Sequence, residues 1–226
     1  MGWRLTLTQF TLDTMQHDSK PMRLSAALRA KPMRLSAALR MTVIFLGLCL
    51  GVSAARAQII TQRTTFFVST YDLQLLCPRQ VEWTLHSSDI GKARREPSWR
   101  FMNDLRHPLA VGTTGDYRRT GFDRGHLCPA LDRSWSRQAM RSTFVMSNIA
   151  PQIPSLNRGA WKVSEDSCRA LAGRYDSIRI VVLPVFLQRD TLRIGTHHLA
   201  VPHAFMKAAW VAGSDSVLAT WFYFNR

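Results

Sequence analysis

The sequence predicts an α+β domain built around a mainly antiparallel sheet. Runs rich in β-branched and aromatic residues alternate with turn-forming residues, and a segment with helical features lies among them at residues 157–172. The chain has 226 residues and is 46% apolar, which suffices for a normal globular core. An apolar segment near the N-terminus stands outside this pattern, so we expect residues 58–226 to form a single domain.

Residues 1–57 have the features of a leader with a signal peptide. The apolar run Met41–Ser53 follows Arg34 and Arg40 and precedes the small-x-small sequence Ala55-Arg56-Ala57. A membrane anchor is disfavoured, because about thirteen apolar residues fall short of the roughly twenty that span a bilayer. We therefore expect cleavage near Ala57, a secreted or periplasmic product, and no stable membrane association afterwards.

A tandem duplication precedes the apolar run. Residues 20–30 are repeated almost unchanged as residues 31–41, but two copies without an apolar core do not make a solenoid. The duplication suggests that translation starts at Met22 or Met33 and that residues 1–32 are an over-extended start, which we expect to be disordered.

The part of the chain after the leader is basic. Residues 58–226 keep 22 of the 30 Lys and Arg and 13 of the 15 Asp and Glu, so their net charge is +9. Such a surface attracts phosphate polyanions through counterion release. A generic basic protein that adheres to anionic surfaces would have the same charge, so charge alone does not decide the function.

Three cysteines remain after the leader, Cys77, Cys128 and Cys168. An odd number in an oxidising compartment requires one thiol to stay free or to pair between chains. A disulfide through Cys77 is possible, but the sequence does not assign its partner. A metal role for Cys128 and Cys168 is disfavoured, because His-x-Cys is not a familiar zinc spacing and buried structural cysteine is commoner.

The first predicted strands cover residues 64–68 and 80–85, the second with period-two alternation. Residues 87–119 are polar and rich in turn formers, which predicts a long loop with short elements. Residues 117–126 then lead into a short strand. A β-rich run at residues 143–149 predicts a buried strand ended by Pro151, which cannot donate to a ladder.

A helix is predicted from Asn157, as its N-cap, to about Ala172, before Gly173. Residues spaced by four along it stay on one flank, which therefore carries Asn157, Trp161, Glu165 and Arg169. An ordinary surface ion pair between Glu165 and Arg169 would give the same spacing. Later strands are predicted at residues 177–186, 192–194, 208–211 and 217–223.

Histidines cluster near the C-terminus at His197, His198 and His203. Neighbouring side chains of a strand point to opposite faces, so His197 and His198 cannot share a metal there. We interpret all of them as ordinary polar or core positions.

The run Asp123-Arg124-Gly125-His126 brings together groups that can cut a phosphodiester. An imidazole that titrates near neutrality can deprotonate water, and a guanidinium can bind an anionic substrate. Gly125 would let the backbone turn sharply so that His126 points outward. Taken alone, the run also fits a surface salt bridge beside a solvated histidine.

Two further motifs follow in order, Asn148-x-x-Pro151-Gln152 and Asn157-x-Gly159-x-Trp161, with Glu165 and Arg169 beyond. Together they resemble the DNA/RNA non-specific endonucleases, from about residue 64 to the C-terminus. The resemblance implies that a ββα-metal finger is inserted in the sheet domain. It also implies a Mg²⁺-dependent endonuclease, in which Mn²⁺ can substitute, with DNA and RNA as substrates, and the leader predicts that this enzyme is exported.

The resemblance implies a role for each matching residue. His126 would be the general base and Asn157 the direct ligand of a hydrated Mg²⁺. Glu165 would orient the waters of the metal, and Arg169 and Arg95 would hold the phosphate.

Arg94 and Arg100 compete with Arg95 for that role. Asp123 and Arg124 would shape the catalytic loop, with Arg124 as a further cation, and Asn148 would support the base.

Two alternatives remain open. A catalytically silent, basic nucleic-acid-binding protein could keep the same scaffold, although the presence of His126 and Asn157 argues against it. A phosphodiesterase for small nucleotides is the weaker alternative. The sequence predicts no protein partner.

Overall fold

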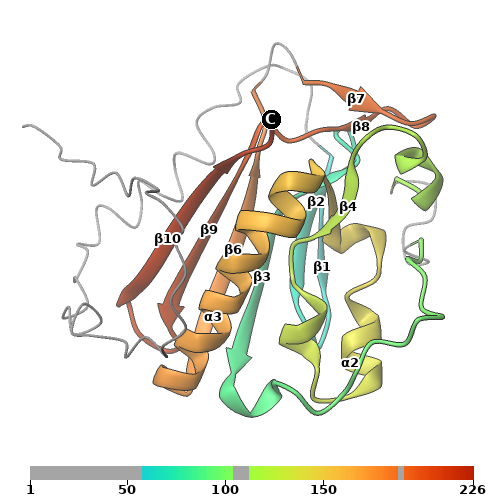
Figure 1. The fold of residues 1–226 in the computed structure, drawn as a ribbon. Helices are drawn as coiled ribbons and strands as arrows, with labels where there is room; N and C mark the ends of the chain where they lie inside the picture. The colour runs from blue at the N-terminus through green and yellow to red at the C-terminus, as the bar shows by residue number, and fades with distance from the viewer. Residues whose placement is uncertain (1–57, 104–111, 188–190) are drawn as a thin grey trace, which may run out of the picture. The chain divides into compact units, whose positions relative to one another are not determined.

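Six antiparallel strands form the main sheet, in the order β1-β2-β3-β6-β9-β10 (Figure 1). The structure is a computed structural model that describes residues 58–103, 112–187 and 191–226, so the predicted signal peptide and tandem repeat lie outside the described residues. The strands are β1 (Ile59–Arg63), β2 (Val68–Asp72), β3 (Cys77–His86), β6 (Ser177–Val185), β9 (Ala204–Val211) and β10 (Val217–Phe224).

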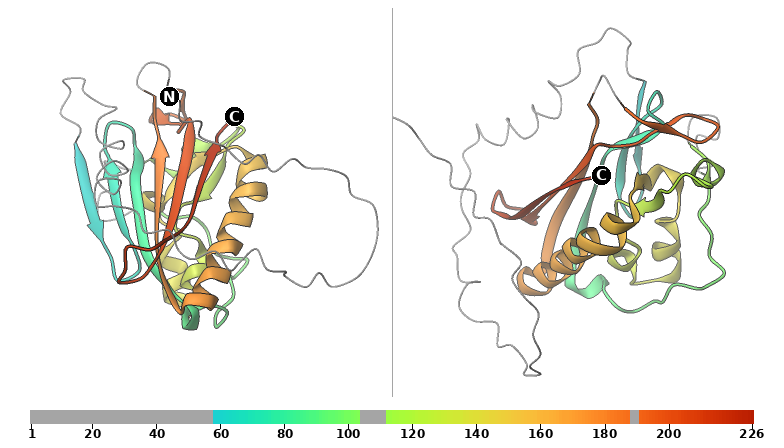
Figure 2. Two further views of the ribbon diagram at one scale, coloured as in Figure 1. Left: turned by 90° about the vertical axis from the view of Figure 1, so that its left-hand side faces the viewer. Right: turned by 45° about the horizontal axis from the view of Figure 1, so that its top comes forward.

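The core lies between this sheet and one long helix, α3 (Trp161–Tyr175). Alternate residues of the central strands are buried, Val81, Trp83 and Leu85 in β3 and Ile178, Ile180 and Val182 in β6. Their period of two places these side chains on one face, and Figure 2 shows α3 lying against a single face of the sheet. The buried residues Trp161, Cys168 and Ala172 belong to the same apolar cluster, so α3 closes the core.

A two-stranded antiparallel sheet, β4 (Asp123–His126) and β5 (Ile149–Gln152), lies beside α3 (Figure 1). The short helix α2 (Arg137–Ser142) follows β4 in the chain, and a 3₁₀ turn at residues 146–148 leads into β5. A hairpin of β7 (Arg193–Ile194) and β8 (Leu199–Ala200) forms the remaining sheet of the described residues. The predicted α+β fold with a mainly antiparallel sheet is confirmed, and β4, β5 and α3 form its ββα unit.

Two predicted strands were wrong. Residues 64–67 form the turn between β1 and β2, because the Thr64 Oγ1 atom accepts hydrogen bonds from the backbone N–H groups of Phe66 and Phe67 at 3.1 and 2.9 Å. Residues 143–148 form a turn after α2, an isolated bridge from Val145 to Met102 and the 3₁₀ turn, and the strand begins only at Ile149. Pro151 lies inside that strand, which is possible because β5 has a single neighbour and needs few donors.

The predicted helix limits were also wrong. Asn157 is no N-cap: it lies in a π-helical turn, Leu156–Ala160, which precedes α3. Gly173 does not end the helix, which continues to Tyr175, and Asp176 follows with a left-handed φ of 64°. His197 and His198 lie in the turn between β7 and β8 rather than in a strand.

The cysteines Cys77, Cys128 and Cys168 are free, buried thiols. The possible disulfide through Cys77 is therefore absent, and burial raises the pKa of both Cys128 and Cys168 to about 12. Within the described ranges, no helix combines the length and apolarity that a membrane span requires.

Candidate active site

The motif residues 123–126 form the whole of strand β4, and His126 pairs with Ile149 of β5. Gly125 pairs with Ala150, and a Cβ atom at this position would overlap the side chain of Gln152, which is fully buried. The sharp turn expected at Gly125 is therefore wrong. Glycine is needed here because β4 packs closely against Gln152.

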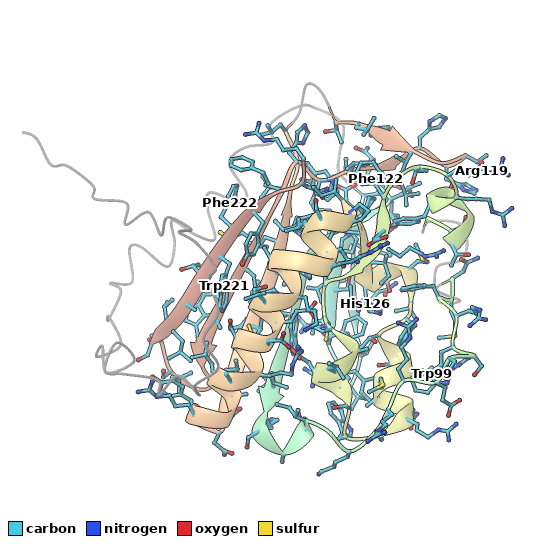
Figure 3. All side chains as sticks on the ribbon, in the orientation of Figure 1. Trp99, Arg119, Phe122, His126, Trp221 and Phe222 are labelled. Atoms are coloured by element: carbon cyan, nitrogen blue, oxygen red, sulfur yellow. The ribbon has the colours of Figure 1, made fainter. Side chains whose placement is uncertain are left out.

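His126 lies in an aromatic setting between α3 and α2 (Figure 3). Its ring centroid is 5.2 Å from that of Phe101 and 4.9 Å from that of Phe144. The side chain as a whole is partly exposed, but its Nε2 atom is buried and has no hydrogen-bond partner among the described residues. Burial lowers the pKa of His126 to about 3, and the charge of Arg95 contributes. The imidazole is thus neutral at physiological pH, with a nitrogen able to accept a proton.

Arg95 is the cation that acts on this histidine. Its guanidinium carbon lies 4.8 Å from the centroid of the Phe144 ring, which itself touches His126. Arg100 is used differently, because its side chain donates to the backbone carbonyl of Pro97 at 2.6 Å. Of the competing arginines, the structure brings Arg95 to the imidazole.

Arg95 also lines a surface groove of about 440 Å³. The groove carries positive charge, since its lining includes one acidic side chain against four basic ones. These are Lys92, Arg94, Arg95 and Arg137, with Glu96 as the acid. Such a groove suits a polyanion that approaches His126.

Asn157 is held by Asp123 from β4. The Asn157 Nδ2 atom donates to Asp123 Oδ2 at 2.9 Å, and the Arg158 guanidinium binds both oxygens of the same carboxylate at 2.7 and 2.8 Å. The hydrogen bond from Arg158 is the main reason that the pKa of Asp123 is lowered. Because the amide nitrogen faces Asp123, the Oδ1 atom is the part of Asn157 available to a cation.

A second contact joins α3 to the end of β4. The Trp161 Nε1 atom donates to the backbone carbonyl of His126 at 3.2 Å. Asn157 and Trp161, four residues apart, therefore hold the two ends of a four-residue strand. These contacts fix the segment that carries Asn157 against the strand whose last residue is His126.

Glu165 lies one turn beyond Trp161 and is partly buried. Burial raises the pKa of Glu165 to about 7, while the positive charge of Lys207 acts in the opposite direction. Half-ionised near neutral pH, this carboxylate can accept hydrogen bonds from water or exchange a proton.

Arg169 is occupied by two carboxylates. Its guanidinium binds Asp132 at 2.8 Å and Asp166 at 2.6 Å, and only 11% of the side chain is exposed. Asp132 is fully buried and also accepts a hydrogen bond from Trp83 Nε1 at 3.0 Å. Contact of Arg169 with a phosphate would have to compete with these ion pairs.

Asn148 and Arg124 contact the loop around the histidine in different ways. Asn148 is fully buried; its Oδ1 accepts from the Cys128 N–H and its Nδ2 donates to the carbonyls of Cys128 and Thr143, all at 2.9 Å. It therefore fixes the backbone just after His126. Arg124 is exposed, and its guanidinium carbon lies 5.0 Å from the centroid of Phe101, which stacks near His126.

The sequence analysis missed two buried charges near the site, Asp132 and Lys207. Both are at most 1% exposed. Lys207 had a detectable signal, because it is the lone charge in the otherwise apolar strand Ala204–Val211. Asp132 had none that we recognise, since it lies in a 3₁₀ turn beside Arg133 and resembles a surface pair.

The donor set limits the metal that this site could hold. Nowhere in the part of the chain that the structure describes do three His, Cys, Asp or Glu side chains gather as metal ligands. A single amide oxygen fits a hard cation that keeps most of its waters, such as Mg²⁺, and does not fit structural zinc. The residues present therefore fit the hydrated ion that the resemblance implies.

Comparisons with known proteins show the family of the chain. A model of the family described as DNA/RNA non-specific endonuclease matches residues 53–225. Mitochondrial endonuclease G of Homo sapiens is 41% identical over 123 residues, which are 50% of this chain and 41% of that protein. Mitochondrial nuclease 1 of Schizosaccharomyces pombe is 44% identical over 130 residues, covering 56% of this chain and 40% of that protein. The chain therefore spans less than half the length of these relatives.

The fold has a solved counterpart as well. A chain in the crystal structure of the EndoG/EndoGI complex, which addresses the mechanism of EndoG inhibition, superposes with a TM-score of 0.68 at 25% identity. The superposition covers 81% of this chain and 80% of that chain.

Proposed function

Because the chain belongs to the DNA/RNA non-specific endonuclease family, we propose that it is a metal-dependent endonuclease that hydrolyses phosphodiester bonds in both DNA and RNA. The observation that carries the proposal is the position of His126. Its neutral ring offers a buried, unpartnered Nε2 atom beside the cation Arg95. A general base and a phosphate-binding charge are thus adjacent.

His126 acts as the base that takes a proton from the attacking water. The two aromatic neighbours, Phe101 and Phe144, restrict its ring and exclude bulk solvent. Burial, and to a smaller extent the charge of Arg95, lower the pKa of His126 to about 3, and a phosphate bound at Arg95 neutralises the part that this charge contributes. The imidazole therefore becomes more basic when substrate arrives.

Asn157 would hold the metal, which we assign to Mg²⁺ with Mn²⁺ as a substitute. A hydrated divalent ion would supply charge neutralisation at the phosphate and at the leaving oxygen. Asp123, which Arg158 also binds, keeps the Asn157 amide oriented, and Glu165 would accept hydrogen bonds from waters there.

The basic groove binds the remainder of the substrate strand. Lys92 and Arg94 line the same groove as Arg95, the cation whose charge acts on His126. Contacts of this kind recognise phosphates and not bases, which agrees with an enzyme that accepts DNA and RNA. Arg169 supports the site through Asp132 and reaches a phosphate only if that ion pair rearranges.

The test is cleavage of supercoiled plasmid and of ribosomal RNA by the purified protein, with Mg²⁺ and with a chelator. We expect both substrates to be cut only with the metal. His126→Ala should abolish cleavage and retain salt-sensitive binding, and Asn157→Ala should raise the Mg²⁺ concentration needed. If both substrates remain uncut at every Mg²⁺ concentration, the result would instead support the catalytically silent nucleic-acid-binding protein.

We also propose that the protein is exported after cleavage near Ala57. The support is the apolar run at residues 41–53 and the small residues that follow it. Two of the relatives named above are mitochondrial, so the alternative destination is an organelle. Cell fractionation followed by N-terminal sequencing decides this, and retention of residues 1–57 on the mature protein would contradict the proposal.

A further inference from the structure

Lys207 is a buried lysine that contacts helix α3 next to the candidate active site, and the proposed reaction gives it no role. Lys207 lies in the centre of β9 and is 1% exposed. A buried ammonium group is costly unless nearby groups compensate its charge. Its surroundings therefore indicate what it does.

The contacts of Lys207 are with α3. Its Nζ atom donates to Ser164 Oγ at 2.8 Å and lies 3.8 Å from the centroid of the Trp161 ring. A cation at this position over an indole is strongly attracted to the ring face. The lysine thus fixes both the ring and the backbone turn that carries Ser164.

These contacts reach the candidate active site through two residues. Trp161 donates its Nε1–H group to the carbonyl of His126, and a cation over the indole face strengthens that donor. Ser164 is the residue directly before Glu165. The charge of Lys207 therefore affects both His126, through Trp161, and Glu165.

The charges that face Glu165 come from three elements. Arg169 and Asp166 lie on α3, Asp132 comes from the 3₁₀ turn after β4, and Lys207 comes from β9. Arg169 is already paired with both of those aspartates. Lys207 belongs to no ion pair among the described residues and has the strongest charge effect of the four on Glu165.

We propose that Lys207 is a positioning residue of the nuclease centre: it holds Trp161 and Ser164 in place and supplies the counter-charge of Glu165. The lysine touches neither substrate nor metal, and its effect passes through these side chains. The inference rests on the proposed function for its kinetic test and on the structure alone for its stability test.

The kinetic test compares Lys207→Met with Lys162→Met, in which an exposed lysine on helix α3 is changed. Methionine keeps most of the length of the side chain and removes the charge. We expect the acid limb of the pH–rate profile of Lys207→Met to move to higher pH by about one unit or more, with KM changed little. Lys162→Met should keep the wild-type profile. A loss that is equal at every pH would overturn the proposal.

The stability test needs no activity. At pH 8, replacing Glu165 by Gln should raise the urea midpoint more in the Lys207→Met background than in the wild type, because the carboxylate there has lost its counter-charge. Equal gains in the two backgrounds would overturn the proposal. If the wild-type protein cuts no nucleic acid, the proposed function fails while this comparison still decides the pairing of Lys207 with Glu165.

Ser164→Ala keeps the proposal testable if Lys207→Met does not fold. The variant leaves the charge and removes the hydroxyl that the ammonium group binds. We then expect a fall in kcat of about tenfold at unchanged KM, equivalent to one lost hydrogen bond to a charged group. An unchanged kcat would overturn the proposal.

Discussion

Replacing Glu165 by Gln should make the protein more stable at alkaline pH while abolishing its proposed activity. The cause is burial, which raises the pKa of Glu165 from 4.5 to about 7. A carboxyl group whose pKa is raised by folding stabilises the protein fully below its unfolded value, and this contribution is lost as the pH rises through the folded value. Above pH 7 the native protein therefore carries an unfavourable charge that glutamine lacks.

The size of the effect follows from the two pKa values of Glu165. A difference of 2.5 between 7 and 4.5 corresponds to about 3 kcal/mol at 1.36 kcal/mol for each pKa unit. Partial exposure of the side chain screens the charge, so we expect about 2 kcal/mol. The attraction to Lys207 is already contained in the folded pKa and needs no separate correction.

Urea unfolding of both proteins at pH 9 and pH 5 measures this contribution. The free energy of unfolding of Glu165→Gln should exceed that of the wild type at pH 9, and the excess should shrink or disappear at pH 5. Asp166→Asn is the matched control, because ion pairs with Lys162 and Arg169 lower the pKa of Asp166. Its difference from the wild type should have the opposite sign at pH 9. A Glu165→Gln variant that is less stable at pH 9, or equally shifted at both pH values, would refute the reasoning.

Three further outcomes are expected. In NMR titrations the His126 ring should show no midpoint between pH 8 and pH 5, because burial lowers its pKa to about 3, and a midpoint near 6.5 would contradict the buried Nε2 atom. Gly125→Ala should lower the free energy of unfolding by about 2 kcal/mol, since its methyl group would overlap the buried Gln152, and unchanged urea stability would show that β4 can move away. Asp132→Asn should cost about 3 kcal/mol by leaving the buried Arg169 with a weaker partner, and a cost below 1 kcal/mol in thermal or urea unfolding would mean that Asp166 alone suffices.

Much of the fold could be predicted from the sequence because successive side chains along its central strands alternate between the core and the exterior. The period-two pattern around Val81, Trp83 and Leu85 identifies β3, and the run at residues 177–186 identifies β6. The run at residues 143–149 misled the prediction because its apolar side chains are buried by turns rather than by a ladder. A hydrophobic run reports burial, and only hydrogen bonding distinguishes a strand from a compact turn.

The candidate site was predictable to the extent that its residues are close in sequence. The motif from Asp123 to His126 and the spacing from Asn157 to Glu165 place the proposed base on β4, the ligand on the π-helical turn and the acid on α3, which directly follows that turn. The hydrogen bond from Asn157 to Asp123 was not predictable, since a sequence pattern treats Asn157 as a helix cap. The contacts of Lys207 with Trp161 and Ser164 were not predictable either, although its place in an apolar strand indicates that it is buried.

The two contacts between α3 and β4 have a mechanical consequence. Asn157 contacts one end of the strand and Trp161 the other, so a displacement of the segment from Asn157 to Trp161 would displace β4 with it. The stretch between the two contacts contains Gly159, whose backbone departs from helical geometry at φ −106° and ψ −110°. A change of the backbone angles at Gly159 would alter the distance between the His126 imidazole and the Asn157 amide. A residue that restricts those angles would keep this distance constant.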